Sequence, residues 1–165
     1  MPKYQIREKM LAIGDDFWID NEDGDRVIKV DGKALRVRET FVFEDRDGNE
    51  LLRIQERKLR LHGTMVIERD GDTVATVRKA LIHPIRDRFE VELDAGGEYK
   101  VHGHILDHEY SFKRDGSQVA TVSKKWLRVR DTYGVEIAEG EDDVLILAAA
   151  IAIERLTDRP GPDDD

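Results

Sequence analysis

The sequence predicts an all-β protein with one helix, arranged as a closed antiparallel barrel of about twelve strands around a buried C-terminal helix. Two observations predict this fold. Near the C-terminus, residues 144–153 form a run of ten apolar residues. Elsewhere, alternating polar and apolar stretches are joined by turns whose glycines, at positions 24, 48, 71, 96 and 116, recur every 20 to 25 residues. Such regular hairpins predict a meandering sheet, and a sheet of about a dozen strands tends to close, which removes its edges.

The apolar run predicts a helix over about residues 143–157. Asp142 or Asp143 can cap the free N–H groups of its first turn, and Pro160 lies just beyond its end. Such a helix would be roughly 22 Å long, whereas a bilayer span needs ~20 apolar residues. Because a helix that is apolar all round is normally buried on every side, we expect it to fill the barrel.

The strands follow from the alternation of apolar and polar residues and from the Asp-Gly turns, in which glycine tolerates a positive φ. We expect the last two strands to pair as a hairpin. The expected strands are residues 4–7, 17–20, 27–30, 35–43, 51–54, 65–67, 73–77, 89–93, 99–105, 110–112, 119–122, 126–130 and 133–137.

Length and composition predict one domain, residues 1–159, followed by a disordered acidic tail, residues 160–165. The chain has no cysteine and a formal net charge of -9. Residues 1–4 lead directly into alternating residues, so we expect no signal peptide, no transmembrane segment and a cytoplasmic protein, with peripheral membrane association as a further option. The negative charge disfavours nucleic acid as a partner.

The C-terminal third carries a family resemblance. The succession Lys124-Lys125-Trp126-Leu127, then Arg130-Asp131-Thr132-Tyr133-Gly134, then Glu141-Asp142-Asp143 entering the apolar helix resembles the LURP-one-related family. The start of the chain, residues 4–9, fits it too. The resemblance implies the architecture shared with Tubby C-terminal domains and phospholipid scramblases, a twelve-stranded barrel around a C-terminal helix. Tubby proteins bind phosphoinositides, and plant LURP-one proteins are linked to pathogen defence.

Four residues form the candidate headgroup-binding site. Lys124, Trp126, Arg128 and Arg130 share one face of an expected strand. If this strand pairs with another basic strand, the cations can hold a phosphate headgroup with the tryptophan at the interface. The alternative is a solvated outer face whose cations are balanced by nearby carboxylates, and the net charge of -9 favours this alternative.

Three histidines form a weaker alternative site. His102 and His104 share a strand face, and His108 follows shortly after, so the three could ligate a metal if the chain folds over. On an exposed strand, however, such imidazoles are more often merely solvated. The Asp-Gly turns lack the ligand spacing of a calcium-binding loop, and the familiar catalytic signatures are absent.

The sequence therefore predicts a binding module that is not an enzyme and needs no cofactor. Its expected ligand is an anionic phospholipid headgroup or a protein partner, bound through the outer face of the barrel. The alternative is a structural or stress- and defence-related scaffold without a small ligand, and a histidine-based metal protein ranks below both.

Overall fold

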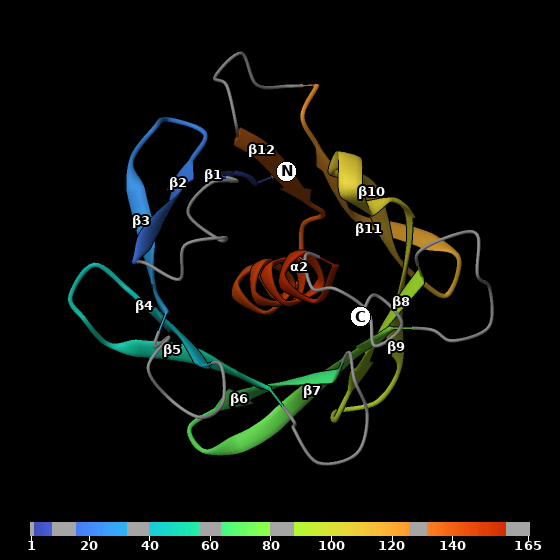
Figure 1. Cartoon of the computed structure of the whole chain (residues 1–165), viewed down its shortest axis with the longest axis horizontal. Coiled ribbons are helices and arrows are strands. Elements are labelled where there is room, and N and C mark those ends of the chain that lie inside the picture. The colour runs from blue at the N-terminus through green and yellow to red at the C-terminus, as the bar shows by residue number, and fades with distance from the viewer. Residues whose placement is uncertain are drawn as a thin grey trace, which may run out of the picture.

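The computed structural model describes residues 2–7, 16–32, 40–56, 64–79, 88–125 and 132–157. Within these ranges the chain forms twelve antiparallel strands, a short 3-10 helix and one long helix (Figure 1). The elements are β1 (Lys3–Arg7), β2 (Phe17–Asn21), β3 (Arg26–Gly32), β4 (Thr40–Glu44), β5 (Glu50–Glu56), β6 (Thr64–Arg69), β7 (Asp72–Lys79), β8 (Arg88–Leu93), β9 (Glu98–His104), η1 (Ile105–Asp107), β10 (Glu109–Arg114), β11 (Ser117–Ser123), β12 (Thr132–Ile137) and α2 (Asp143–Thr157).

The sheet is a meander that closes on itself. Each strand pairs with its neighbours in the sequence, and β1 pairs with β12 to complete the barrel, with Ile6 opposite Tyr133. The predicted fold class, a closed barrel of about twelve strands around a C-terminal helix, is confirmed.

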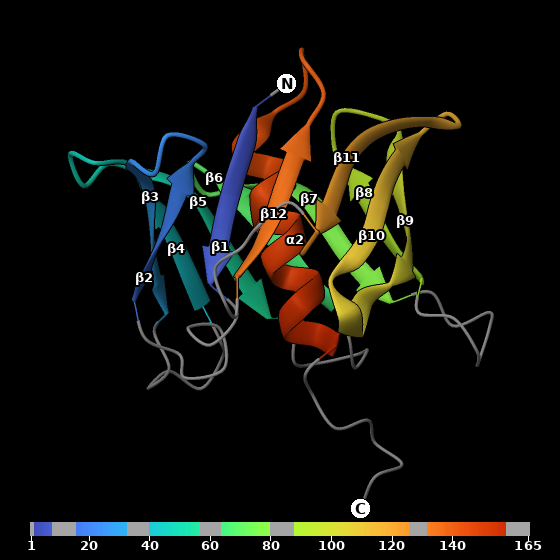
Figure 2. The same cartoon turned by 90° about the horizontal axis from the view of Figure 1, so that it is seen from above.

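The helix α2 runs through the middle of the barrel (Figures 1 and 2). Every residue from Leu145 to Glu154 is at most 7% exposed. The lumen around it is lined by apolar side chains that alternate along the strands, such as Leu52 and Ile54 on β5 or Phe89 and Val91 on β8. A helix without a polar face is stable here because every side of it meets apolar strand residues.

The expected strand pair 126–130 and 133–137 lies partly outside the described residues. Its second strand corresponds to β12, which has β11 on one side, with Val122 opposite Val135, and β1 on the other. Both edges of β12 are therefore occupied. Residues 126–130, most of the expected strand 35–43 and the tail 160–165 lie outside the described residues.

Candidate functional site

The two ends of the barrel differ in what they carry (Figure 2). At one end, here called the hairpin end, lie the five turns with Gly24, Gly48, Gly71, Gly96 and Gly116, and α2 begins there. At the other end, here called the η1 end, η1 joins β9 to β10 and α2 finishes. Any functional surface has to be located relative to these two ends.

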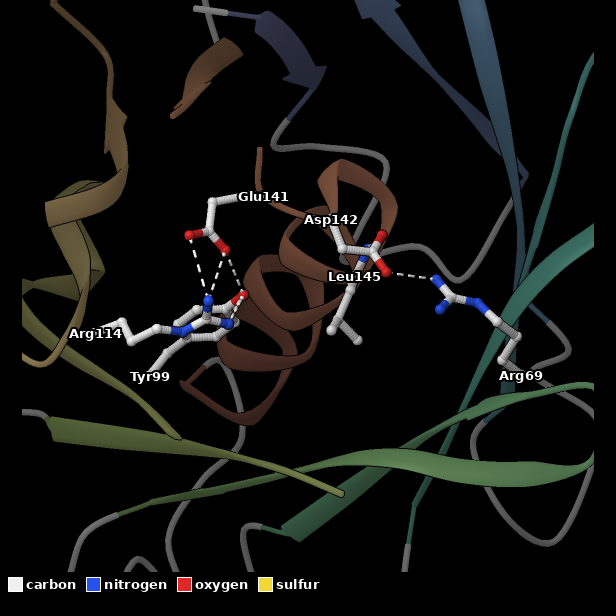
Figure 3. Close-up of polar contacts among 6 residues, drawn as sticks. All are labelled: Arg69, Tyr99, Arg114, Glu141, Asp142 and Leu145. Carbon is white, nitrogen blue, oxygen red and sulfur yellow. Dashed lines mark hydrogen bonds and ion pairs between the residues drawn. The ribbon is translucent and has the colours of Figure 1, made fainter. Parts of the chain in front are cut away.

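At the hairpin end, three consecutive acidic residues, Glu141, Asp142 and Asp143, connect the start of α2 to the barrel wall. Figure 3 shows the first two of them with their partners. Glu141 accepts a hydrogen bond of 2.9 Å from the Tyr99 hydroxyl of β9 and lies 3.4 Å from the Arg114 guanidinium of β10. Asp142 forms an ion pair of 2.8 Å with Arg69 of β6. We call Glu141, Asp142, Asp143 and these partners the acidic collar.

The third collar contact reaches the strand that closes the barrel. The Tyr4 hydroxyl of β1 donates a hydrogen bond of 2.7 Å to Asp143. Asp142 also caps the helix, since its Oδ1 accepts the backbone N–H of Leu145 at 3.2 Å. The collar thus joins the first turn of α2 to β1, β6, β9 and β10, and its charges oppose the positive end of the helix dipole.

Two arginines of the collar were missed in the sequence, although a signal for them exists. Arg69 continues the alternation of Met65 and Ile67, which places it on the inward face of β6. Arg114 continues Tyr110 and Phe112 on β10 in the same way. An arginine on the inward face at the end of a strand indicates an acidic partner at that end of the barrel.

The collar changes the acidity of its tyrosines. Burial, reinforced by the hydrogen bond to Asp143, raises the pKa of Tyr4 above its usual value. Burial and the hydrogen bond to Glu141 raise the pKa of Tyr99, and the nearby Arg114 offsets part of this rise. Both phenols therefore stay protonated and act as donors to the acidic segment.

A second polar cluster lies inside the barrel toward the η1 end. Glu154 of α2 is 3% exposed, and it accepts a hydrogen bond of 2.8 Å from the Tyr110 hydroxyl. Its second carboxylate oxygen lies 2.9 Å from Nδ1 of His108, and the His108 ring stacks on Tyr133 at 4.6 Å between centroids. Burial, followed by the charge of Glu154, raises the pKa of Tyr110 well above its usual value. A buried carboxylate needs such partners to offset its lost hydration.

The structure does not bring the three candidate histidines together. His102 and His104 lie on β9 with exposed side chains, whereas His108 is buried against Glu154. Among the described residues, no group of three His, Asp or Glu side chains is placed to hold a metal ion. His108 belongs to the barrel interior and is separated in this way from the two exposed histidines.

Of the four candidate headgroup residues, the structure describes Lys124. It is exposed immediately after β11, and its backbone N–H donates a hydrogen bond of 3.1 Å to Glu109 on β10. The same carboxylate accepts the Ser123 hydroxyl at 2.8 Å. Trp126, Arg128 and Arg130 lie outside the described residues, in the segment that joins β11 to β12.

Several cations on the outer wall of the barrel have an acidic neighbour. Arg78 pairs with Glu92 at 2.6 Å, and Arg53 pairs with Glu50 at 2.7 Å. Lys100 lies 3.9 Å from Glu98. At these three positions the positive charge of the wall is balanced by a carboxylate. In the described part of the chain, no helix has the length and apolar character needed to cross a bilayer.

Comparison with known proteins identifies the family of this chain. Residues 3–154 match the model of the family described as LURP-one-related. The chain belongs to this family. The curated relative YxjI of Bacillus subtilis (strain 168), described as an uncharacterized protein, is 28% identical over 152 residues, which cover 92% of this chain and 91% of YxjI.

The LURP-one-related barrel also has a solved structural counterpart. An X-ray structure of a protein from Arabidopsis thaliana superimposes with a TM-score of 0.68 at 16% identity, covering 96% of this chain and 91% of that one. At this identity the likeness concerns the fold. The family and its barrel support a binding or scaffold module.

Proposed function

We propose that this LURP-one-related barrel is a non-enzymatic binding module that recognises its ligand on the outer surface. The observation that carries the proposal is the filled lumen, because each residue of α2 from Leu145 to Ile153 is buried against the strands. Barrels that carry a small ligand inside need an interior free of their own side chains. A ligand of this protein therefore has to meet the wall or one of the two ends.

The ligand class we favour is an anionic phospholipid headgroup, bound through Lys124, Trp126, Arg128 and Arg130. Exposure of Lys124 at the end of β11 supports this choice, since exposed lysines attract phosphate groups and arginines can bind them in bidentate fashion. The resemblance to Tubby domains points to the same ligand class. In this proposal the protein is cytoplasmic and binds the membrane surface reversibly.

The test is sedimentation with liposomes whose anionic and phosphoinositide content is varied, from low to high salt. We expect binding that depends on the headgroup and weakens as salt rises. The double variant Lys124→Glu/Arg128→Glu should lose most of it. The matched control, Lys29→Glu/Lys100→Glu, changes the net charge equally on the outer wall and should bind better than the first variant. Unchanged binding by Lys124→Glu/Arg128→Glu would contradict the assignment.

A protein-binding scaffold without a small ligand is the second candidate. The balanced wall favours it, because Arg53, Arg78 and Lys100 each have a carboxylate within 4 Å and the whole chain carries a net charge of -9. This candidate predicts that no soluble headgroup raises the melting temperature. A headgroup that raises the melting temperature further as its concentration increases would exclude the scaffold.

A further inference from the structure

At the η1 end, one large apolar side chain points into solvent. Leu106, the middle residue of η1, is 67% exposed, and it is the exposed large hydrophobic residue of the described part of the chain. Its neighbour Ile105 is 1% exposed and packs in the core. A single exposed leucine is ordinary on a protein surface, so its surroundings decide whether it has a role.

The turn that presents Leu106 is held firmly by the barrel. The His108 backbone adopts a left-handed conformation, with φ 54°, and its N–H donates a hydrogen bond of 3.0 Å to the Ile105 carbonyl. The His108 side chain is fixed inside by Tyr133 and Glu154. The side chains of Ile105 and His108 both lie in the barrel interior, and the Leu106 side chain is left facing solvent.

A glycine just before the turn is part of the same construction. Gly103 has φ +141°, and a Cβ at this position would lie 2.6 Å from the Glu109 carbonyl oxygen. The close approach of β9 and β10 therefore requires glycine. This constraint on β9 and β10 fixes the backbone that presents Leu106.

Basic residues lie close to this turn. Glu109, three residues after Leu106, accepts the backbone N–H of Lys124, and Lys124 and Lys125 are both exposed. The η1 end therefore combines an apolar side chain with two lysines on the adjacent strand end. This combination suits a surface that offers both anionic charge and an apolar interior.

Among the described residues, many aspartates lie at the opposite, hairpin end of the barrel. Each of the five hairpin turns carries aspartate, and the acidic collar adds Glu141, Asp142 and Asp143. The turn aspartates are Asp23, Asp25, Asp45, Asp47, Asp70, Asp72, Asp94 and Asp115. Tilted strands of this length separate the ends by roughly 15 Å, which exceeds the screening length of ~8 Å at physiological salt. These aspartates, which contribute to the net charge of -9, therefore lie away from a surface that the η1 end would approach.

We propose that the η1 end is the membrane-docking face, and that Leu106 enters the boundary between headgroups and acyl chains while Lys124 and Lys125 contact anionic lipid. The proposal rests on the proposed lipid-binding function and adds to it the orientation of the barrel and an apolar anchor. The hairpin end, with its aspartates, then points away from the bilayer.

The absence of cysteine allows a direct test of the orientation. Leu106→Cys is labelled with a polarity-sensitive fluorophore and mixed with vesicles of phosphatidylcholine containing phosphatidylserine. We expect a blue shift and an intensity increase on these vesicles and none on phosphatidylcholine alone. Ser117→Cys, exposed at the hairpin end of the same β10–β11 pair, is the control and should not respond. A response at Ser117→Cys and none at Leu106→Cys would overturn the orientation.

Binding of the unlabelled variants separates the two proposals. Leu106→Asn should weaken vesicle binding about tenfold, because an apolar contact is lost, and it should leave the salt dependence of binding unchanged. Lys124→Gln/Lys125→Gln should weaken it about 30-fold and reduce the salt dependence. Asp107→Asn, which removes a carboxylate beside the anchor, should strengthen binding.

If wild type binds anionic vesicles and Leu106→Asn binds equally well, the docking inference fails and the lipid-binding function stands. If wild type binds no vesicle at any salt, both fail, and a protein partner for the Leu106 turn becomes the interpretation. Circular dichroism should show the same melting curve for Leu106→Asn and wild type, because this side chain is exposed.

Discussion

At the scale of single residues, Glu154 is the informative position in the barrel interior. The rest of the buried part of α2, from Leu145 to Ile153, is apolar and offers no feature that would fix the rotation or the depth of the helix. Glu154 provides one, through the Tyr110 hydroxyl and Nδ1 of His108. We interpret this cluster as the contact that fixes the C-terminal part of the helix, as the acidic collar fixes its start, a role in which buried polar groups are known to act.

Glu154→Leu should lower the free energy of unfolding by about 3 kcal/mol, because Tyr110 and His108 lose their buried partner. Glu154→Gln keeps an acceptor for the Tyr110 hydroxyl and should cost less. Urea denaturation followed by circular dichroism measures both. Equal stability of Glu154→Leu and wild type would show that the cluster contributes nothing to the fold.

At the scale of elements, the start of α2 is fixed by charge and its body by apolar packing. The three acidic residues contact four different strands, so the collar holds the helix against β1, β6, β9 and β10 at once. The apolar run alone predicts that the helix is buried, and Asp142 could be expected as its cap. The partners on the strands could be found only once the pairing placed Tyr4, Arg69, Tyr99 and Arg114 at one end.

Two substitutions of Asp142 separate its roles. Asp142→Ala removes the cap and the ion pair with Arg69, and it should lower the free energy of unfolding by about 1–2 kcal/mol. Asp142→Asn keeps the cap and should cost less than 1 kcal/mol. Thermal and chemical denaturation compare the two. If Asp142→Asn lowers the free energy of unfolding as much as Asp142→Ala does, the effect is assigned to the ion pair with Arg69.

Raised phenol pKa values predict how the barrel responds to alkali. The pKa values of Tyr4, Tyr99 and Tyr110 lie above the usual value of 10.0 in the folded state, so the unfolded state releases these protons first as pH rises. The stabilisation is complete below about pH 10 and is lost progressively above it. In an absorbance titration of phenolate, these tyrosines should ionise together with unfolding. Tyr110→Phe should remove one of these delayed ionisations, and reversible titration of all tyrosines at pH 10 in the folded protein would contradict the assignment.

At the scale of the whole molecule, the barrel and its helix are one structure. The wall is lined with apolar side chains from all twelve strands, and α2 covers them from the inside. Without the helix, these side chains would face water or an empty lumen, and both are unfavourable.

A chain that ends at Glu141 should therefore not fold cooperatively, whereas a chain that ends at Arg159 keeps α2 and should fold like the full chain. Circular dichroism and the dispersion of amide resonances test both. A soluble, cooperatively folded chain ending at Glu141 would refute the dependence of the barrel on its helix. The longer truncation also tests the predicted domain boundary.

The fold was predictable because two periodicities dominate the sequence: alternation along the strands and an uninterrupted apolar run for the helix. The candidate functional site was less predictable than the fold. Alternation along a strand does not identify its neighbours, and β12 lies between β11 and β1, a strand from the far end of the chain. Spacing alone groups His108 with His102 and His104. In the structure the backbone of His108 is left-handed at the end of η1, and its side chain lies in the barrel interior.

The order of the elements along the chain has a consequence for biosynthesis. Both the strand that closes the barrel, β12, and the helix that fills it come from residues 132–157, the last part of the barrel to leave the ribosome. Until then, eleven strands with apolar inner faces and open edges at β1 and β11 have been made but cannot close. At 5–20 residues per second, this exposed state lasts for several seconds. We therefore expect the apolar inner faces of the first eleven strands to stay exposed during synthesis until residues 132–157 have emerged.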